Sequence, residues 1–235
     1  QSPAFIRDAA IRIAAVDPEV SSREFAKNYL TRIESFVTTD CLRALRGEAV
    51  SRIPQMKRTF IPAHKKGAAL SYEQIHILAP HCLAFYHSPE VQKWISRVVG
   101  QKVYPTPDHD QSSESILCYH EPGDHINWHY DHNFYRGRHF TVLLSLVNEG
   151  PGGLSQGTLQ RSLSDKTSQD IETGPNTLVV FEGARIRHRA TAVGEDERRV
   201  MLSMTYCTDP RIGRFNDFVR RCKDTAFFGL RALWD

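Results

Sequence analysis

The second half of the chain consists of short apolar runs, and this feature limits the folds available to it. From Val103 onward these runs are separated by turns rich in Gly, Pro and Asp. About eight short strands at this spacing are typical of a jelly roll, or double-stranded β-helix, in which two sheets face each other. Cupins and lectins share the pattern, so it indicates a fold class and not a function. We predict strands over residues 103–104, 115–120, 126–131, 139–147, 158–163, 177–181, 188–193 and 199–207.

The first hundred residues instead have the apolar spacing of helices. Ser22 can begin a helix whose stripe continues to Phe36, and Pro80 should break a helical stretch over residues 71–87. Residues 53–69 are predicted to form a loop because prolines and a glycine interrupt them. Further helices are expected at 3–15, after Asp40, at 89–99, at 215–222 and at 225–233. The predicted class is α+β, one domain over 1–235: a helical buttress (1–100), a β-helix core (101–208) and a C-terminal helical cap (209–235).

Composition narrows the possible partners. The 235 residues suffice for one substantial core, and the net charge of +3 is spread along the chain, so we expect no nucleic-acid partner. No apolar run approaches the length of a membrane span, and no membrane association is expected. The five cysteines have no framework spacing, which favours reduced thiols and a cytoplasmic location. The oligomeric state is not indicated.

One His-x-Asp pair, His129 and Asp131, ends the stretch CYHEPGDHINWHYD. Side chains two residues apart on a strand lie on the same face, so the imidazole and the carboxylate can reach one point. His188, which follows the apolar run 177–181, is the best candidate for a third ligand. Two histidines and one carboxylate on one face of an octahedral ion form the facial triad of non-haem Fe(II) oxygenases.

An arginine follows the third candidate ligand by ten residues. Arg198 lies beyond the turn 194–196, at the head of the last strand-like run. A hairpin at this turn would place Arg198 alongside the strand that carries His188. A buried guanidinium at that position would suit bidentate pairing with a carboxylate.

Together these residues resemble the Fe(II)/2-oxoglutarate-dependent dioxygenases, in their prolyl-4-hydroxylase-like branch. The likeness covers Glu114 to Cys207. It includes Tyr119 and Gly123 before the first ligand, the turn Gly152-Gly153-Leu154, and the run Pro-x-Thr-Leu-Val-Val-Phe that ends at Phe181. The resemblance implies that His129, Asp131 and His188 bind iron, that Arg198 pairs with the distal carboxylate of 2-oxoglutarate, and that the Tyr119 hydroxyl assists it.

The resemblance also implies a reaction. Such enzymes use O2 to convert 2-oxoglutarate to succinate and hydroxylate an unactivated carbon of the substrate. In the halogenating relatives a small residue replaces the carboxylate ligand and leaves a site for chloride. This chain has Asp131 at that position, so hydroxylation is the expected outcome.

The substrate is predicted from a finer likeness. Residues 127–146, NWHYDHNFYRGRHFTVLLSL, resemble the group of hydroxylases and radical halogenases that act on free amino acids, lysine included. A free, basic amino acid is therefore the expected small-molecule substrate. Two alternatives stay open, a prolyl or other peptidyl hydroxylase and a β-helix module that binds a ligand without turnover. The candidate substrate-binding residues are Glu121, His132, Thr205 and Trp234. The basic residues of 53–69, Lys57, Arg58, Lys65 and Lys66, are expected to be solvated; the alternative is that this loop folds over the site and meets a substrate carboxylate.

Overall fold

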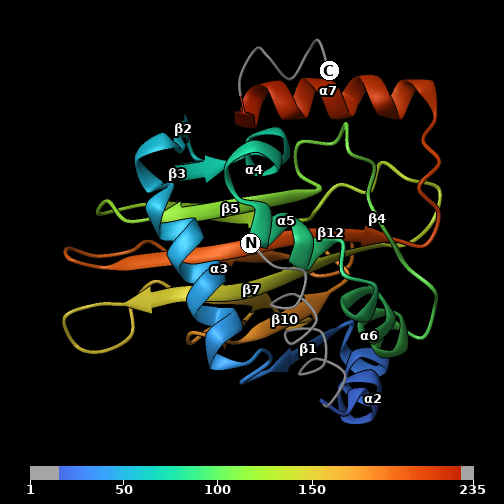
Figure 1. Ribbon diagram of the computed structural model, residues 1–235, viewed down its shortest axis with the longest axis horizontal. Coiled ribbons are helices and arrows are strands. Elements are labelled where there is room, and N and C mark those ends of the chain that lie inside the picture. The colour runs from blue at the N-terminus through green and yellow to red at the C-terminus, as the bar shows by residue number, and fades with distance from the viewer. Residues whose placement is uncertain (1–15, 229–235) are drawn as a thin grey trace.

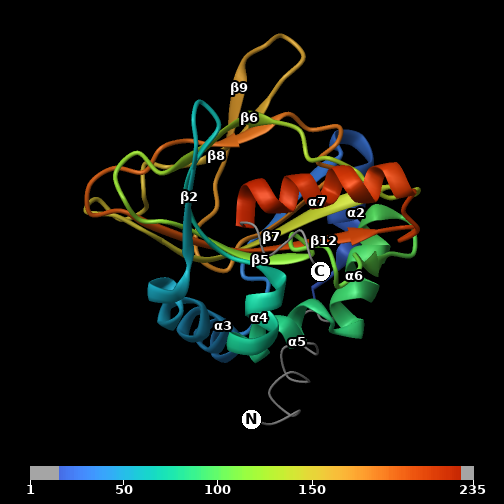
Figure 2. The same cartoon turned by 90° about the horizontal axis from the view of Figure 1, so that it is seen from above.

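The strands form one antiparallel sheet that curls into two facing layers (Figures 1 and 2). The structure is a computed structural model that describes residues 16–228. The strand order is β1-β10-β7-β12-β5-β3-β6-β11-β8-β9, with β2 paired to β3 and β4 paired to β12. The strands are β1 (Leu30–Ile33), β2 (Lys57–Ile61), β3 (Lys65–Leu70), β4 (Tyr104–Pro105), β5 (Glu114–Tyr119), β6 (His125–His129), β7 (His139–Glu149), β8 (Leu159–Ser162), β9 (Ser168–Ile171), β10 (Leu178–Phe181), β11 (His188–Ala190) and β12 (Arg198–Cys207).

The two layers meet at β3. Its end pairs with β5, through Ala68↔Cys118, and its start pairs with β6, through Lys65↔Ile126. We call β1, β10, β7, β12, β5 and β3 the major sheet, and β6, β11, β8 and β9 the minor sheet. This arrangement confirms the predicted jelly roll.

Helices cover the outer face of the major sheet, on the side away from the minor sheet (Figure 2). They are α2 (Pro18–Asn28), α3 (Thr39–Ser51), α4 (Tyr72–Leu78), α5 (Pro80–Tyr86) and α6 (Pro89–Val99), while α7 (Arg214–Phe228) runs across one end of the sandwich (Figure 1). No helix within residues 16–228 is both long and apolar enough to cross a membrane.

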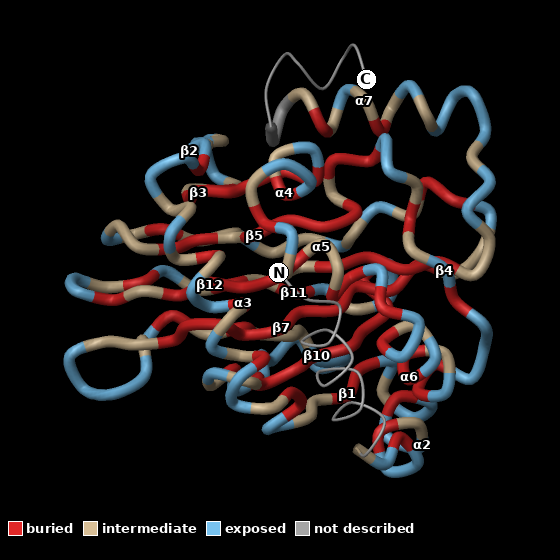
Figure 3. The backbone as a smooth tube through the Cα atoms, in the orientation of Figure 1, coloured by how far each residue is buried: buried red, intermediate tan, exposed pale blue. Residues whose placement is uncertain are grey.

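The main hydrophobic core lies between these helices and the major sheet, whose central strands are buried along most of their length (Figure 3). On β12, Val200, Leu202, Met204 and Tyr206 enter this core. Because strand side chains alternate between faces, the intervening positions of β12 face the interior of the sandwich. This alternation determines which β12 residues can reach a site between the sheets.

The helix boundaries follow from capping and from proline. Asp17 accepts a hydrogen bond from the Glu19 backbone N–H at 3.0 Å, and α2 stops at Tyr29, whose φ of 54° is left-handed. Gly100 ends α6 in the same conformation, as the sequence predicts. Pro80 separates α4 from α5, which confirms the predicted break.

Two expectations for the first hundred residues are wrong. The helix predicted to continue to Phe36 ends at Asn28, and Leu30–Ile33 instead form β1 beside β10. Residues 53–69, predicted to be a loop, contain the hairpin of β2 and β3, with Pro62 in the connection between the two strands. The helix expected at 3–15 lies outside the described residues. Strand β9 was also not predicted; its exposed polar residues have no apolar alternation.

The expected hairpin between the strands of His188 and Arg198 is wrong as well. Strand β11 pairs with β6 and β8 in the minor sheet, whereas β12 pairs with β5 and β7 in the major sheet. The turn at 194–196 therefore connects the two sheets, and Arg198 does not lie alongside the strand of His188.

Candidate metal centre and its cavity

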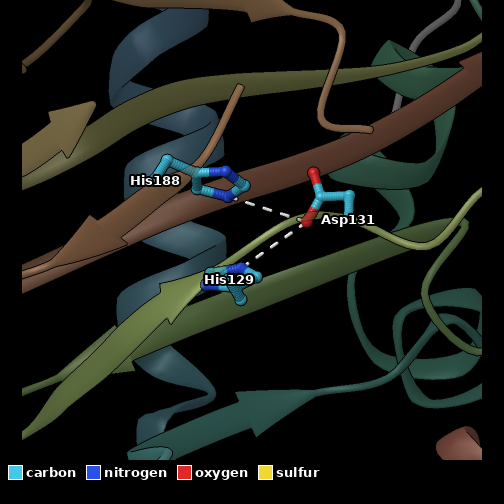
Figure 4. Close-up of side chains that lie close together, drawn as sticks. All are labelled: His129, Asp131 and His188. Atoms are coloured by element: carbon cyan, nitrogen blue, oxygen red, sulfur yellow. Dashed lines mark ion pairs between the residues drawn. The ribbon is translucent and has the colours of Figure 1, made fainter. Parts of the chain in front are cut away.

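Three side chains converge between the two sheets (Figure 4). His129 ends β6, His188 begins β11, and the two residues face each other in the strand register. Asp131 follows β6, with its Oδ1 at 3.5 Å from His129 Nε2 and at 3.6 Å from His188 Nε2. One ligand atom from each residue lies within 4.8 Å of the other two. The structure thus brings together all three residues predicted from the spacing.

Backbone contacts fix the orientation of both imidazoles. His129 Nδ1 lies 2.8 Å from the Asn127 carbonyl, and His188 Nδ1 lies 2.9 Å from the Ile186 carbonyl. Each Nδ1 therefore donates its proton to a carbonyl oxygen, and each Nε2 presents a lone pair to the common point. Burial lowers the pKa of His188, which favours the neutral ring that a metal requires. Two imidazole nitrogens and one carboxylate suit Fe(II) and leave three coordination positions open.

Asp131 is held as an anion. Its Oδ2 accepts a hydrogen bond from the Thr141 hydroxyl on β7, and its backbone N–H donates to the Gly183 carbonyl at 3.1 Å. Burial acts to raise the pKa of Asp131, but the neighbouring His188 and His129 and the bond from Thr141 lower it below the ordinary range. The carboxylate therefore remains charged at neutral pH and can contribute a negative ligand.

Gly183 leaves the space that Asp131 occupies. A Cβ atom at this position would lie 2.1 Å from Asp131 Oδ2. We expect Gly183→Ala to displace the carboxylate and to weaken Fe(II) binding by roughly 10- to 100-fold, as losses around metal ligands usually do. Equilibrium titration with Fe(II) under anaerobic conditions measures the change.

Gly152→Ala is the matched control, because no atom lies within 4 Å of the added carbon. It should bind Fe(II) as the unmodified protein does. Equal affinities for the Gly183→Ala and Gly152→Ala proteins would contradict the proposed position of Asp131.

A cavity of about 380 Å³ opens beside the triad, between the two sheets. The middle of its wall is apolar and includes Leu117, Leu143, Leu159, Phe181 and Met201. Polar and charged residues line its two ends. We call the end at Tyr119 and Arg199 the inner end, and the end beneath α7, where Val219 and Lys223 line the cavity, the outer end.

A buried arginine occupies the inner end. Arg199 is 2% exposed, and its Nη2 donates to the Thr173 hydroxyl at 3.0 Å. Its Nε and Nη1 have no hydrogen-bond partner among the described residues. Tyr119 faces Arg199 across the β5–β12 register and also lines the cavity. A buried guanidinium with unused donors is costly unless an anion binds there, so this end is suited to a carboxylate.

The remaining predicted site residues have different positions. Arg198 pairs with Glu149 near the surface and does not line the cavity. The position predicted for Arg198, next to the carboxylate of 2-oxoglutarate, is occupied by Arg199 instead. Glu121 also lies outside, paired with Arg58 at 2.8 Å. Two other predicted residues, His132 and Thr205, do line the cavity. Trp234 falls outside the described residues.

Several cavity residues were not predicted as part of the site. Lys65, left open as a possible contact for a carboxylate, is 4% exposed and lines the cavity, and burial lowers its pKa to about 8. Asp110 and Lys223 line the outer end, 3.5 Å apart. The sequence gives a signal that Lys65 borders a buried segment, since Gly67, Ala68 and Ala69 shortly after it form a compact apolar run. Asp110 and Lys223 have none, because 112 positions separate them.

Comparison with known proteins identifies a family for this fold and site. Residues 15–215 match the family model described as Halogenase D. The chain belongs to the Halogenase D family. The match includes all three triad residues and Arg199, but stops before Lys223. No curated protein matches the chain.

Solved structures similar to this Halogenase D family member include two prolyl hydroxylases and an epimerase. A prolyl-4-hydroxylase from Pseudomonas putida has a TM-score of 0.64 at 16% identity, over 82% of this chain and 99% of that one. A prolyl hydroxylase from Trichoplax adhaerens, in complex with a peptide fragment, has 0.66 at 15%, over 82% and 90%. The epimerase SnoN, in complex with Fe3+ and alpha ketoglutarate, has 0.63 at 12%, over 88% and 84%.

At these identities the likeness establishes the fold. Together with the family match and the His-Asp-His triad, it identifies this Halogenase D family member as a 2-oxoglutarate- and Fe(II)-dependent oxygenase. This outcome agrees with the family resemblance seen in the sequence. The substrate and the outcome of the reaction are separate questions, which depend on the residues of the cavity.

Proposed function

We propose that this chain hydroxylates an unactivated C–H bond of a free amino acid, with Fe(II), 2-oxoglutarate and O2. The observation that carries the proposal is the carboxylate of Asp131, directed at the same point as the Nε2 atoms of His129 and His188. Three protein ligands would leave three positions on the metal, enough for a 2-oxo acid and oxygen. A chloride ion would have no position of its own.

Each residue of the site has a defined role in this proposal. His129, Asp131 and His188 hold the iron. The Arg199 guanidinium binds the distal carboxylate of 2-oxoglutarate through its unused donors, and Thr173 and Tyr119 help to position it. The apolar wall between the two ends of the cavity keeps water away from the reacting carbon. When bound, iron, 2-oxoglutarate and O2 supply the oxidative chemistry that yields succinate, CO2 and the hydroxylated product.

The name of the family raises halogenation as a competing outcome, and Asp131 provides the test. We expect Asp131→Gly to lose most hydroxylation, because the iron loses a ligand and a balancing charge. Little or no chlorinated product should form even in high chloride, since chlorine transfer also depends on where the substrate lies, which the loss of one metal ligand does not change. Mass spectrometry of the products distinguishes the outcomes.

The two alternative results of that experiment have separate meanings. Full hydroxylation by Asp131→Gly would show that Asp131 is not a ligand. Efficient chlorination would show that the ligand alone controls the outcome.

A free amino acid is favoured because the cavity is small and helix α7 lies over one end of it. Its volume of about 380 Å³ lies in the lower part of the usual range for small-molecule sites, roughly 300–1,000 Å³. That space has to hold both 2-oxoglutarate and the reacting part of the substrate. Helix α7 lies over the outer end, where Val219 and Lys223 line the cavity.

Glu121, the carboxylate expected to bind a basic substrate side chain, does not line the cavity. This carboxylate is directed away from the cavity and pairs with Arg58. We therefore propose a free amino acid as the substrate, and the residues at the outer end of the cavity decide which charge its side chain can carry.

Succinate release from Fe(II) and 2-oxoglutarate, measured across a panel of free amino acids and proline-containing peptides, tests the proposal. At least one free amino acid should raise the release above the background without substrate. If peptides alone raise it, the peptidyl hydroxylase alternative is correct. A protein that binds amino acids but releases no succinate with any of them would be a binding module.

A further inference from the structure

The outer end of the cavity carries one ammonium and one carboxylate, and both are fixed in place. Asp110 is 3% exposed; its Oδ2 accepts a bond of 2.6 Å from the Tyr135 hydroxyl, and its Oδ1 accepts one of 2.9 Å from the Ser112 backbone N–H. Lys223 Nζ lies 3.5 Å from Asp110 Oδ1 and donates to the Ser112 hydroxyl at 2.8 Å. This pair is therefore held in one geometry before any substrate binds.

Helix α7 is anchored so that Lys223 points into the cavity. Arg220, one turn earlier, is 1% exposed and donates to Asp224 Oδ2 at 2.8 Å and to the His109 carbonyl at 2.6 Å. Asp224 is also fully buried, and its Oδ1 lies 3.0 Å from Lys223 Nζ. Loss of one member of such a buried charge network is strongly destabilising, so α7 keeps its position over the cavity.

We propose that Asp110 and Lys223 recognise the head group of a zwitterionic amino acid, and that the substrate has no net positive charge. The Lys223 ammonium binds the substrate α-carboxylate, and the Asp110 carboxylate binds its α-ammonium. The four charged groups then alternate in sign, and each bond is charge-assisted. This inference rests on the proposed function and names the substrate class of the same site.

The charges of the cavity wall exclude a second ammonium on the substrate. Within residues 16–228, the only carboxylates that line the cavity are Asp110 and Asp131. Asp131 is directed at the metal position, and Asp110 is used by the α-ammonium. The side-chain ammonium of a lysine-like substrate would thus find only neutral acceptors such as Ser115 and Ser203, and no carboxylate to balance its charge, which is unfavourable in a buried site.

Apolar residues line the part of the cavity next to this pair, where the substrate side chain would lie. Phe134 lies beneath Lys223, with the Nζ 5.2 Å from the ring centroid, and both line the cavity. Val219 of α7 and Leu143 of β7 line it as well. We therefore expect a neutral, mainly aliphatic or aromatic side chain.

The test compares acid and amide forms of the same amino acid. The neutral amino acid that gives the most succinate release is titrated, as the free acid and as the α-amide, into protein loaded anaerobically with Fe(II) and 2-oxoglutarate. The free acid should bind roughly tenfold to a hundredfold more tightly, because the amide cannot form the ionic bond to Lys223. L-lysine should bind more weakly than L-norleucine, whose side chain is similar in length but neutral.

Variants of Lys223 connect this discrimination to the residue. Lys223→Met should reduce the acid-to-amide affinity ratio to near one, and Lys223→Arg should keep most of it. Arg221→Met is the matched control, since Arg221 is on the same helix but pairs with Asp217 outside the cavity. It should keep the full ratio. Both affinities in the ratio are measured on the same variant, so a general loss of stability affects them equally and leaves the ratio unchanged.

The possible outcomes separate this inference from the proposed function. If free amino acids stimulate succinate release but the acid and amide bind equally, or if Lys223→Met keeps the ratio, the head-group assignment is wrong. If L-lysine is the best ligand, the neutral substrate class is wrong. If no free amino acid stimulates release and peptides do, the proposed function fails and this inference fails with it.

Discussion

Replacing His188 by alanine is expected to abolish substrate-stimulated succinate release and to weaken Fe(II) binding by more than about a hundredfold. Loss of residues that merely orient metal ligands typically costs 10- to 100-fold, and the loss of a ligand should cost more. His188 and His129 face each other across β11 and β6, so His129→Ala should have the same effect. Anaerobic Fe(II) titration and a succinate assay measure both quantities.

An exposed histidine provides the control for this experiment. His76 lies on α4 at the surface, far from the cavity lining, so His76→Ala should bind iron normally. Circular dichroism should show that all three variants remain folded, since each removes one imidazole and no main-core residue. Near-native activity in either ligand variant would disprove the assignment of the metal centre.

Replacing Arg199 by alanine is expected to raise the 2-oxoglutarate concentration required for half-maximal succinate release by tenfold or more. Its contact with the distal carboxylate is a charge-assisted hydrogen bond in a buried site, worth roughly 1.5–3 kcal/mol. Fe(II) affinity should change little, because within the described residues the Arg199 guanidinium bonds to Thr173 and to none of the three triad residues. Titration of 2-oxoglutarate into the Fe(II)-loaded protein without O2 measures the same loss without turnover.

The adjacent residue is a stringent control. Arg198→Ala removes the same side chain one position earlier, where it pairs with Glu149 instead of lining the cavity. Its 2-oxoglutarate requirement should be close to that of the unmodified protein. If Arg198→Ala raises the requirement and Arg199→Ala does not, the assignment made from the structure is incorrect.

The convergence of the three triad residues could be predicted because its signal is local. His129 and Asp131 are two positions apart at the end of one strand, and His188 follows a second apolar strand. Strand alternation also places Ser203 and Thr205 on the same face of β12 as Arg199, and all three line the cavity. Such patterns relate residues that are close in the sequence, so they can be recognised without knowing the tertiary structure.

The assignment of Arg198 failed for a topological reason. The prediction assumed that the turn at 194–196 closes a hairpin, but β12 crosses to the other sheet. The alternation of Val200, Leu202 and Met204 in the main core contains the correct information, since it places Arg199 on the cavity face. The ten-residue spacing from His188 thus points to Arg198, whereas the alternation of β12 points to Arg199.

The outer end of the cavity could not be predicted because its residues are distant in the sequence. Asp110 precedes β5, and Lys223 lies on a helix after the last strand. Their proximity results from α7 packing over the sandwich, which no local pattern encodes (Figure 1). Glu121 illustrates the opposite case, since it is close to the ligands in sequence but pairs with Arg58 of β2.

The central claim, hydroxylation of a free amino acid, is tested most directly by following labelled oxygen. The protein is supplied with Fe(II), 2-oxoglutarate, chloride, the preferred amino acid and 18O2, and the amino acid product is analysed by mass spectrometry. We predict a product that has gained one 18O atom, formed together with one succinate per molecule. A chlorinated product, or succinate release with the amino acid recovered unchanged, would contradict the account.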